Sequence, residues 1–224
     1  MKTKKIDWLN HIIGLFVVFL GVTAGFILQN RKETITNQNL EQKYLTGFYD
    51  DVNQSIIDLK EAIADDSLWL VQNKYAIPQI TTGTLQTDSA AKLMLSMAHF
   101  SKFMAQTNTY ENITNSGNLN LITSYEYKQA IVIYYKSLED FELLEFYFEN
   151  FGTQSFMPYL LENFDMFSQK FEYPNAEKSA KFKNIFATFY SLKQQRIEGY
   201  NRILKESEEF KQQLETLSYI SNNH

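Results

Sequence analysis

Hydrophobic residues are distributed along this chain in two different ways. Residues 12–28 read IIGLFVVFLGVTAGFIL and contain no charged side chain. Beyond residue 44, apolar residues recur every three or four positions, which is the period of one face of an α-helix. The first run predicts a membrane-spanning helix, because a bilayer core of about 30 Å needs about 20 apolar residues. The second pattern predicts a water-soluble domain built from amphipathic helices.

Basic residues on either side of the apolar run predict its orientation. Three lysines and the free amine precede the run, and two basic residues follow it closely: Lys2, Lys4, Lys5, Arg31 and Lys32. Lysine and arginine are enriched on the cytoplasmic side of a membrane helix. We therefore expect residues 1–11 to be cytoplasmic and residues 12–28 to cross the inner membrane. The rest of the chain is then periplasmic.

A cleaved signal peptide is the alternative to a retained anchor. Val22 and Ala24 have the small-residue spacing of a cleavage site. Against cleavage, residues 25–28 continue the apolar run past that site, and mature chains rarely begin in this way. We predict a retained anchor.

Small residues share one face of the predicted membrane helix. Gly21 and Gly25 form a G-x-x-x-G pair, and Gly14 falls on the same face seven residues earlier. Small residues let membrane helices approach closely, so this face predicts packing against a second copy or a partner's helix. The alternative is that glycine is simply common in membrane-spanning helices.

Beyond the anchor, the pattern predicts a polar stalk and a helical bundle. Residues 29–44 are almost wholly polar and lack glycine and proline, so the helix should continue through them as a solvated stalk. Residues 45–224 should form the bundle. Its four predicted helices cover about 45–75, 88–104, 124–151 and 176–220, with a short helical piece at 110–115 and loops at 79–87 and 168–177. The short connections predict an all-α, antiparallel four-helix bundle with the first and last helices longest.

Composition agrees with this fold and excludes one class of partner. Only 8 glycines and 3 prolines occur, and 14 tyrosines and 18 phenylalanines can fill a large core. A net charge of -5 argues against nucleic-acid binding, which rewards a basic surface. With no cysteine in the chain, disulfides cannot indicate the compartment.

Residues suited to catalysis or metal binding are scarce. None of His11, His99 and His224 has another histidine or a carboxylate at metal-ligand spacing on the same helix. Cysteine nucleophiles, phosphate-binding loops and dinucleotide fingerprints are all missing. We predict no enzymatic activity, no cofactor and no metal.

Acidic residues concentrate in two adjacent pairs and one stripe: Asp50-Asp51, Asp65-Asp66, and Glu142, Glu145 and Glu149. Neighbouring positions on a helix point about 100° apart, so neither pair can converge on one ion. The glutamates do share a face, where a cation held with help from a partner helix is the alternative to a solvated surface. We expect solvated surfaces for all of them.

The most distinctive polar segment is NSGNLNLI at residues 115–122. Polar turns on rigid scaffolds often carry recognition, so Asn115, Ser116, Gly117 and Asn118 form a candidate docking turn. The alternative is a turn that only ends a helix, with Gly117 in the left-handed C-terminal position. The leucines and the isoleucine that follow would then close the end of the bundle.

Three motifs accompany the anchor: EQKYLTGFYDDV at 41–52, TYENITNSGNLNLI at 109–122, and the pair Tyr134-Tyr135. Together with the anchor they resemble an uncharacterised family of small, N-terminally anchored membrane proteins common in Bacteroidota, a domain of unknown function. The resemblance implies the membrane topology and the all-α fold class. It implies no activity and no catalytic residues.

An anchor, a stalk and a bundle without visible chemistry predict a non-enzymatic, membrane-tethered interaction protein. We expect an accessory or scaffolding subunit of the cell envelope that contacts a protein partner or a second copy. The alternative is an extracytoplasmic sensory domain that binds a small ligand between its helices and signals through a partner. An enzyme assembled from dispersed carboxylates and tyrosines is a third, weaker hypothesis.

Overall fold

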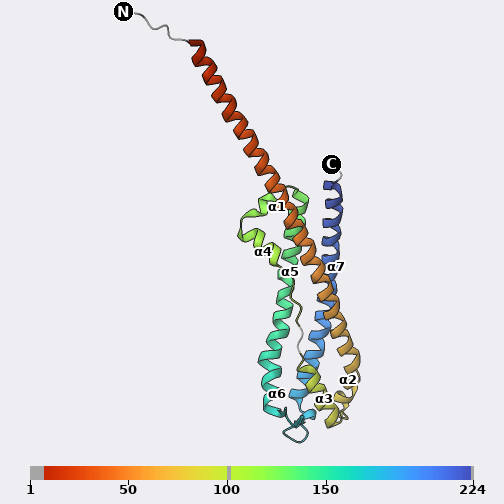
Figure 1. Ribbon diagram of the computed structural model, residues 1–224. Helices are drawn as coiled ribbons and strands as arrows, with labels where there is room; N and C mark the ends of the chain where they lie inside the picture. Colours follow the sequence, from red (N-terminus) through yellow and green to blue (C-terminus); the bar gives the residue numbers. More distant parts are fainter. Residues whose placement is uncertain (1–7, 100–101, 223–224) are drawn as a thin grey trace, which may run out of the picture.

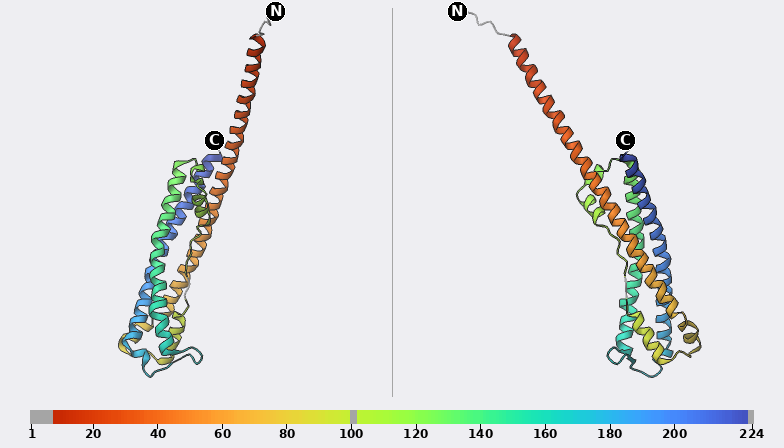
Figure 2. Two further views of the ribbon diagram at one scale, coloured as in Figure 1. Left: turned by 90° about the vertical axis from the view of Figure 1, so that its left-hand side faces the viewer. Right: turned by 45° about the vertical axis from the view of Figure 1, so that its right-hand side comes forward.

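The computed structural model describes residues 8–99 and 102–222, and this part of the chain is almost entirely α-helical (Figure 1). Three long helices dominate it: α1 (Trp8–Asn73), α5 (Tyr125–Phe151) and α7 (Ala180–Asn222). They run side by side over the length of the bundle, and α1 continues well beyond it (Figure 2). The predicted all-α class is confirmed.

Helix α1 is one unbroken helix of 66 residues. Its side chains at positions 11–28 are exposed, apart from a half-buried Thr23. This one helix contains a stretch that is long and apolar enough to cross a membrane. The predicted continuity of apolar run, stalk and first bundle helix is therefore confirmed as helical structure. The lysines that precede the run lie outside the described residues.

We call the end at which α1 leaves the bundle the proximal end, and the opposite end the distal end (Figure 1). At the proximal half, the apolar stripe of α1 packs against α5 and α7 in one core. That core includes Phe48, Val52, Leu59, Ile131, Leu138, Phe141, Ile203 and Phe210. A second core at the distal half is closed by short helices. The last helix returns to the proximal end, as predicted (Figure 1).

The connection that follows α1 is more helical than predicted. Helix α2 (Ala76–Thr82) occupies part of the expected loop at 79–87. Pro78 lies in the first turn of α2, where a missing backbone N–H costs no helical hydrogen bond. Gly83 ends α2 with a left-handed φ of 73°.

The second predicted helix is shorter than expected. Helix α3 (Thr87–Met97) begins after Gln86 and ends well before Met104, which was expected on its apolar face. Residues 102–107 form no regular structure and run along the bundle, and Met104 is 68% exposed. Helix α4 (Asn108–Asn115) follows at the proximal end. Two short helices, α3 and α4, together with residues 102–107, thus take the place of one long second helix.

Predicted boundaries near the distal end are partly wrong. Gly152 and Pro158, which were expected to kink or break the third helix, do not end it, because a π-helical turn, η2 (Gly152–Phe156), leads directly into α6 (Met157–Asn163). A π turn absorbs an extra residue without ending the helix. The expected loop at 168–177 includes only the second strand of a small antiparallel hairpin, β1 (Phe164–Asp165) with β2 (Lys170–Phe171), and it ends in the 3₁₀ turn η3 (Ala176–Lys178).

Side-chain caps set the start of two long helices. Ser124 Oγ accepts a hydrogen bond from the backbone N–H of Tyr127 (3.2 Å), so α5 begins where it was predicted. Ser179 Oγ accepts one from Phe182 N (3.1 Å), and α7 therefore begins later than the expected Ala176. These bonds satisfy N–H groups that have no partner within the helix.

Candidate functional site

Three motifs that are far apart in the sequence meet at the proximal end of the bundle. Helix α4 and the 3₁₀ turn η1 (Asn118–Leu121) pack against α1, and α5 lies beneath them (Figure 1). The motif at 41–52 thus contacts the motif at 109–122, and Tyr135 of α5 stacks under α4. Each of the three motifs can be recognised in the sequence. Nothing in the local sequence indicates that they form one site.

Two carboxylates of α1 hold the ends of this segment. Asp51 Oδ2 accepts a hydrogen bond from the backbone N–H of Thr109 (2.9 Å), in the first turn of α4. Such an N–H has no partner within its own helix and carries partial positive charge. At the other end, Glu41 Oε1 accepts bonds from Thr123 N (2.6 Å) and Thr123 Oγ1 (2.9 Å). The segment between Thr109 and Thr123 is therefore fixed to α1 at both ends.

Gly47 allows α1 and α4 to approach each other closely. A Cβ atom at this position would lie 2.8 Å from Thr109 Oγ1 and 3.1 Å from Thr109 Cγ2. One helical turn earlier, the Tyr44 hydroxyl accepts a hydrogen bond from Asn118 Nδ2 (2.9 Å). The face of α1 that carries these residues is shaped to receive the segment.

The candidate docking turn projects from this clamped segment. Asn115, Ser116 and Gly117 are exposed, whereas Asn118 is half-buried against Tyr44. Gly117 has φ 71° and ψ 12°, so its expected left-handed conformation is confirmed. The buried Ile113 and Ile122 flank the turn and anchor it to the proximal core. Recognition by this turn stays a prediction.

Gly117→Val is expected to lower the free energy of unfolding by about 1–2 kcal/mol, because a β-branched residue is strained at positive φ. Nothing lies within 4 Å of a Cβ at this position, so backbone strain alone is tested. Urea denaturation of the full-length protein in non-ionic detergent measures the change. Gly117→Asn should be milder, since asparagine tolerates this conformation. Equal losses for both variants would contradict the assignment.

Aromatic rings make the site rigid. Tyr110 of α4 stacks on Tyr135 of α5, with ring centroids 4.2 Å apart and planes 7° apart. Tyr134 stacks in the same way on Phe210 of α7 (4.5 Å, 15°). Burial raises the pKa of both the Tyr134 and Tyr135 hydroxyls. The tyrosine pair therefore ties the docking segment to two long helices.

The glycine face of α1 is open within the described residues. Gly14, Gly21 and Gly25 are exposed, and no atom lies within 4 Å of a Cβ built on any of them. Packing of this face against another helix stays a prediction.

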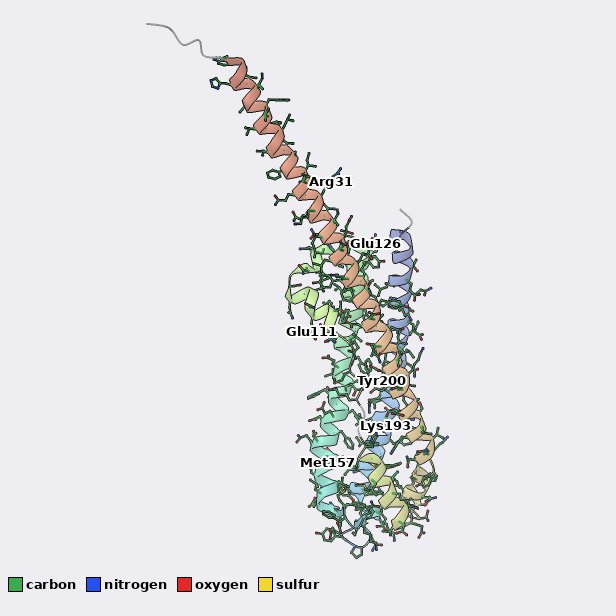
Figure 3. The ribbon with its side chains drawn as sticks, in the orientation of Figure 1. Arg31, Glu111, Glu126, Met157, Lys193 and Tyr200 are labelled. Atoms are coloured by element: carbon green, nitrogen blue, oxygen red, sulfur yellow. The ribbon has the colours of Figure 1, made fainter. Side chains whose placement is uncertain are left out.

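A second polar group lies in the middle of the bundle. It contains Asp66 of α1, Glu145 of α5, and Lys193, Arg196 and Tyr200 of α7; Figure 3 shows where Lys193 and Tyr200 lie. Lys193 Nζ lies 2.5 Å from Asp66 Oδ1, and Arg196 Nη1 lies 3.5 Å from Asp66 Oδ2. Glu145 Oε1 accepts from Arg196 Nε (3.3 Å) and from the Tyr200 hydroxyl (2.5 Å).

The expected solvated positions of Asp66 and Glu145 are wrong. Asp66 is 0% exposed and Glu145 is 2% exposed, whereas the adjacent Asp65 and the stripe members Glu142 and Glu149 are exposed as predicted. A signal was present, since both residues continue an apolar stripe in steps of three or four. Asp66 follows the stripe of the first helix, and Glu145 lies between Phe141 and Phe148.

Charges within this cluster balance, since two carboxylates face two cations. Burial raises the pKa of Glu145 and lowers that of Lys193, and the ion pairs oppose both shifts. The cations also lie against aromatic rings: Arg196 Cζ is 4.0 Å from the Phe148 centroid, and Lys193 Nζ is 5.3 Å from that of Phe189. Buried ion pairs of this kind contribute little net stability. They do penalise any alternative packing of the three long helices that would separate the partners.

Metal binding finds no support in the described part of the chain, where no group of three or more His, Cys, Asp or Glu residues could hold an ion. His11 and His99 are exposed, and His99 lies beyond the end of α3, not within a helix. His224 lies outside the described residues.

No protein-family profile matches the chain, and no curated protein and no solved structure is significantly similar to it. The resemblance to the Bacteroidota family therefore stays a prediction.

Proposed function

We propose that the chain is a single-pass protein of the inner membrane whose periplasmic bundle docks onto another envelope protein as an accessory or scaffolding subunit. One observation carries the proposal. Helix α1 joins an exposed apolar stretch, which nothing in the described part of the chain covers, to the folded bundle without a break. A bilayer covers such a stretch, and the excess of lysines before it favours a cytoplasmic N-terminus.

In this proposal, the continuous helix α1 holds the bundle at a defined distance from the membrane. At about 1.5 Å per residue, the part of α1 between Leu28 and Glu41 spans about 20 Å. The docking turn, which is fixed beside Glu41, is then close to the membrane surface. The distal end, near Asn73, lies about 70 Å from it. A membrane-embedded partner therefore meets the proximal end first.

The docking turn is suited to this role because it is both exposed and held in place. Asn115 and Ser116 are exposed to solvent, while both ends of the segment are bonded to α1. A preorganised surface loses little conformational entropy on binding. The open face of Gly14, Gly21 and Gly25 provides a second contact within the membrane.

Site-specific photocrosslinking in native membranes tests the proposal. A photoreactive residue at Asn115 should give a heteromeric adduct, and the same residue at Glu198, exposed on α7 away from the turn, should not. Gly117→Val in the Asn115 background should reduce the adduct, because it strains the turn. Equal adducts from both positions, or a homodimer alone, would rule out the accessory-subunit proposal.

The extracytoplasmic sensory domain remains a second candidate because of one observation. A cavity of about 430 Å³ lies between residues 102–107 and helix α5, beside the buried charged cluster. Its size falls within the range of small-molecule sites, about 300–1,000 Å³.

A further inference from the structure

The cavity beside the charged cluster combines aromatic rings with carboxylates. Its lining includes Phe103, Phe141, Phe146, Glu142, Glu145 and Glu149. Phe103 and Phe141 are buried and meet edge to face (5.9 Å, 64°), whereas Phe146 is 57% exposed at the opening. The irregular segment 102–107 forms one wall and α5 forms the other.

Glu145 presents a largely buried carboxylate to the cavity. Both of its hydrogen bonds, from Arg196 and Tyr200, go to Oε1. The side chain is 2% exposed and lines the cavity. Its negative charge is therefore presented to a ligand in the cavity, where poor access of water strengthens electrostatic attraction.

The cavity wall carries an excess of negative charge. Lys102 pairs with Glu149 at 3.2 Å, and Arg196 is shared between Glu145 and Asp66. Glu142 forms no ion pair within the described part of the chain, so its charge is not balanced locally. An anionic ligand is therefore disfavoured, and a cation is attracted.

The spacing of the carboxylates favours an organic cation over a metal ion. Glu142 and Glu149 are separated by two helical turns, about 10 Å along α5. Metal ions need several oxygen ligands at about 2.0–2.6 Å, and the described residues contain no group of three or more His, Cys, Asp or Glu that could hold one. An organic ammonium is larger, and the faces of aromatic rings attract it.

We propose that this cavity binds a small organic cation, a quaternary ammonium or substituted amine. Its charge lies between the carboxylates of Glu142 and Glu145, and its apolar groups contact Phe103, Phe141 and Phe146. The cavity is lined by none of the residues of the docking turn, and the proposal does not depend on the proposed docking function. Because Glu145 also pairs with α7, the ligand contacts the group that joins the three long helices.

Titration calorimetry of the full-length protein in maltoside detergent tests this site with choline as the probe. Its neutral carbon isostere, 3,3-dimethyl-1-butanol, has the same shape without the charge. Choline should bind saturably and the isostere at least about tenfold more weakly, since both carboxylate attraction and cation–π attraction are lost. Equal affinity for the two compounds, or no saturable heat with choline, overturns the proposal.

Matched variants locate the binding. Glu142→Gln should weaken choline binding by about fivefold to tenfold, and Phe146→Ala by about threefold to tenfold. Both side chains are exposed, so neither change disturbs the core. Glu139→Gln, an exposed change on the same helix outside the cavity, should leave the affinity unchanged. Unchanged affinity in Glu142→Gln, or an equal loss in Glu139→Gln, overturns the assignment of the site.

Discussion

Arg196→Met is expected to lower the free energy of unfolding by about 3–5 kcal/mol, the cost of breaking a buried ion pair by removing one partner. Arg196 is 0% exposed and pairs with both Asp66 and Glu145. Methionine fills much of the same volume. The loss of stability therefore reflects the missing charge more than an empty cavity. Chemical denaturation of the full-length protein in non-ionic detergent measures it.

The matched control is Lys60→Met, which breaks an exposed pair with Glu208 (2.9 Å; side chains 58% and 53% exposed). Exposed pairs contribute about 0–1 kcal/mol, so this variant should be nearly neutral. A similarly small effect of Arg196→Met would show that the buried cluster does not hold the helices together.

The loss in Arg196→Met should also depend on pH. Burial raises the pKa of Glu145 above its ordinary value, and Arg196 opposes that rise. Without the arginine, the folded state binds a proton at Glu145 more tightly than the unfolded state does. Stability of the variant relative to wild type should therefore recover as the pH falls through the raised pKa. A loss that grows on acidification would contradict this origin.

The long helices could be predicted because burial along one face leaves a local signature. Phe48, Val52 and Leu59 recur at helical spacing and are all buried in the proximal core. Ser124 and Gly117 mark a helix start and a left-handed turn for equally local reasons. Such features depend on neighbouring residues in the chain, so one sequence is enough to find them.

The second predicted helix is present but ends early, and tertiary contacts hold the chain beyond it. Apolar spacing continues to Met104, but Phe103 is buried while Met104 is exposed, so the chain there is not helical. The backbone N–H of Gln106 instead donates to Ser55 Oγ of α1 (3.0 Å). A partner 51 residues away leaves no trace in the local pattern.

Both candidate sites depend on the same kind of distant pairing. Glu41 with Thr123 and Glu145 with Arg196 are separated by 82 and 51 residues. None of these residue types indicates a distant partner by itself. In the sequence, the charged residues Lys193 and Arg196 resemble those of a solvent-exposed helix face. The signal that was overlooked is the stripe Phe189, Lys193, Arg196 and Tyr200, whose steps of four, three and four place both cations toward the core.

Removing residues 1–28 is expected to release the protein from the membrane completely while leaving the stability of the bundle unchanged within about 0.5 kcal/mol. The apolar stretch of α1 is exposed and shares no core with the rest: the first buried hydrophobic residue of the proximal core is Leu45. Full-length protein should sediment with membranes and resist alkaline carbonate extraction, and the fragment 29–224 should be soluble, helical and equally resistant to urea.

A second truncation, to residues 45–224, separates the stalk from the anchor. It removes Glu41 and Tyr44, and with them the bonds to Thr123 and Asn118. Since hydrogen bonds to a charged group contribute about 1.5–3 kcal/mol, this fragment should be less stable than 29–224 by at least that much. If both fragments were equally stable, the clamp on the docking segment would have no energetic role. If 29–224 itself were strongly destabilised or stayed in the membrane, residues 12–28 would not be a separate anchor.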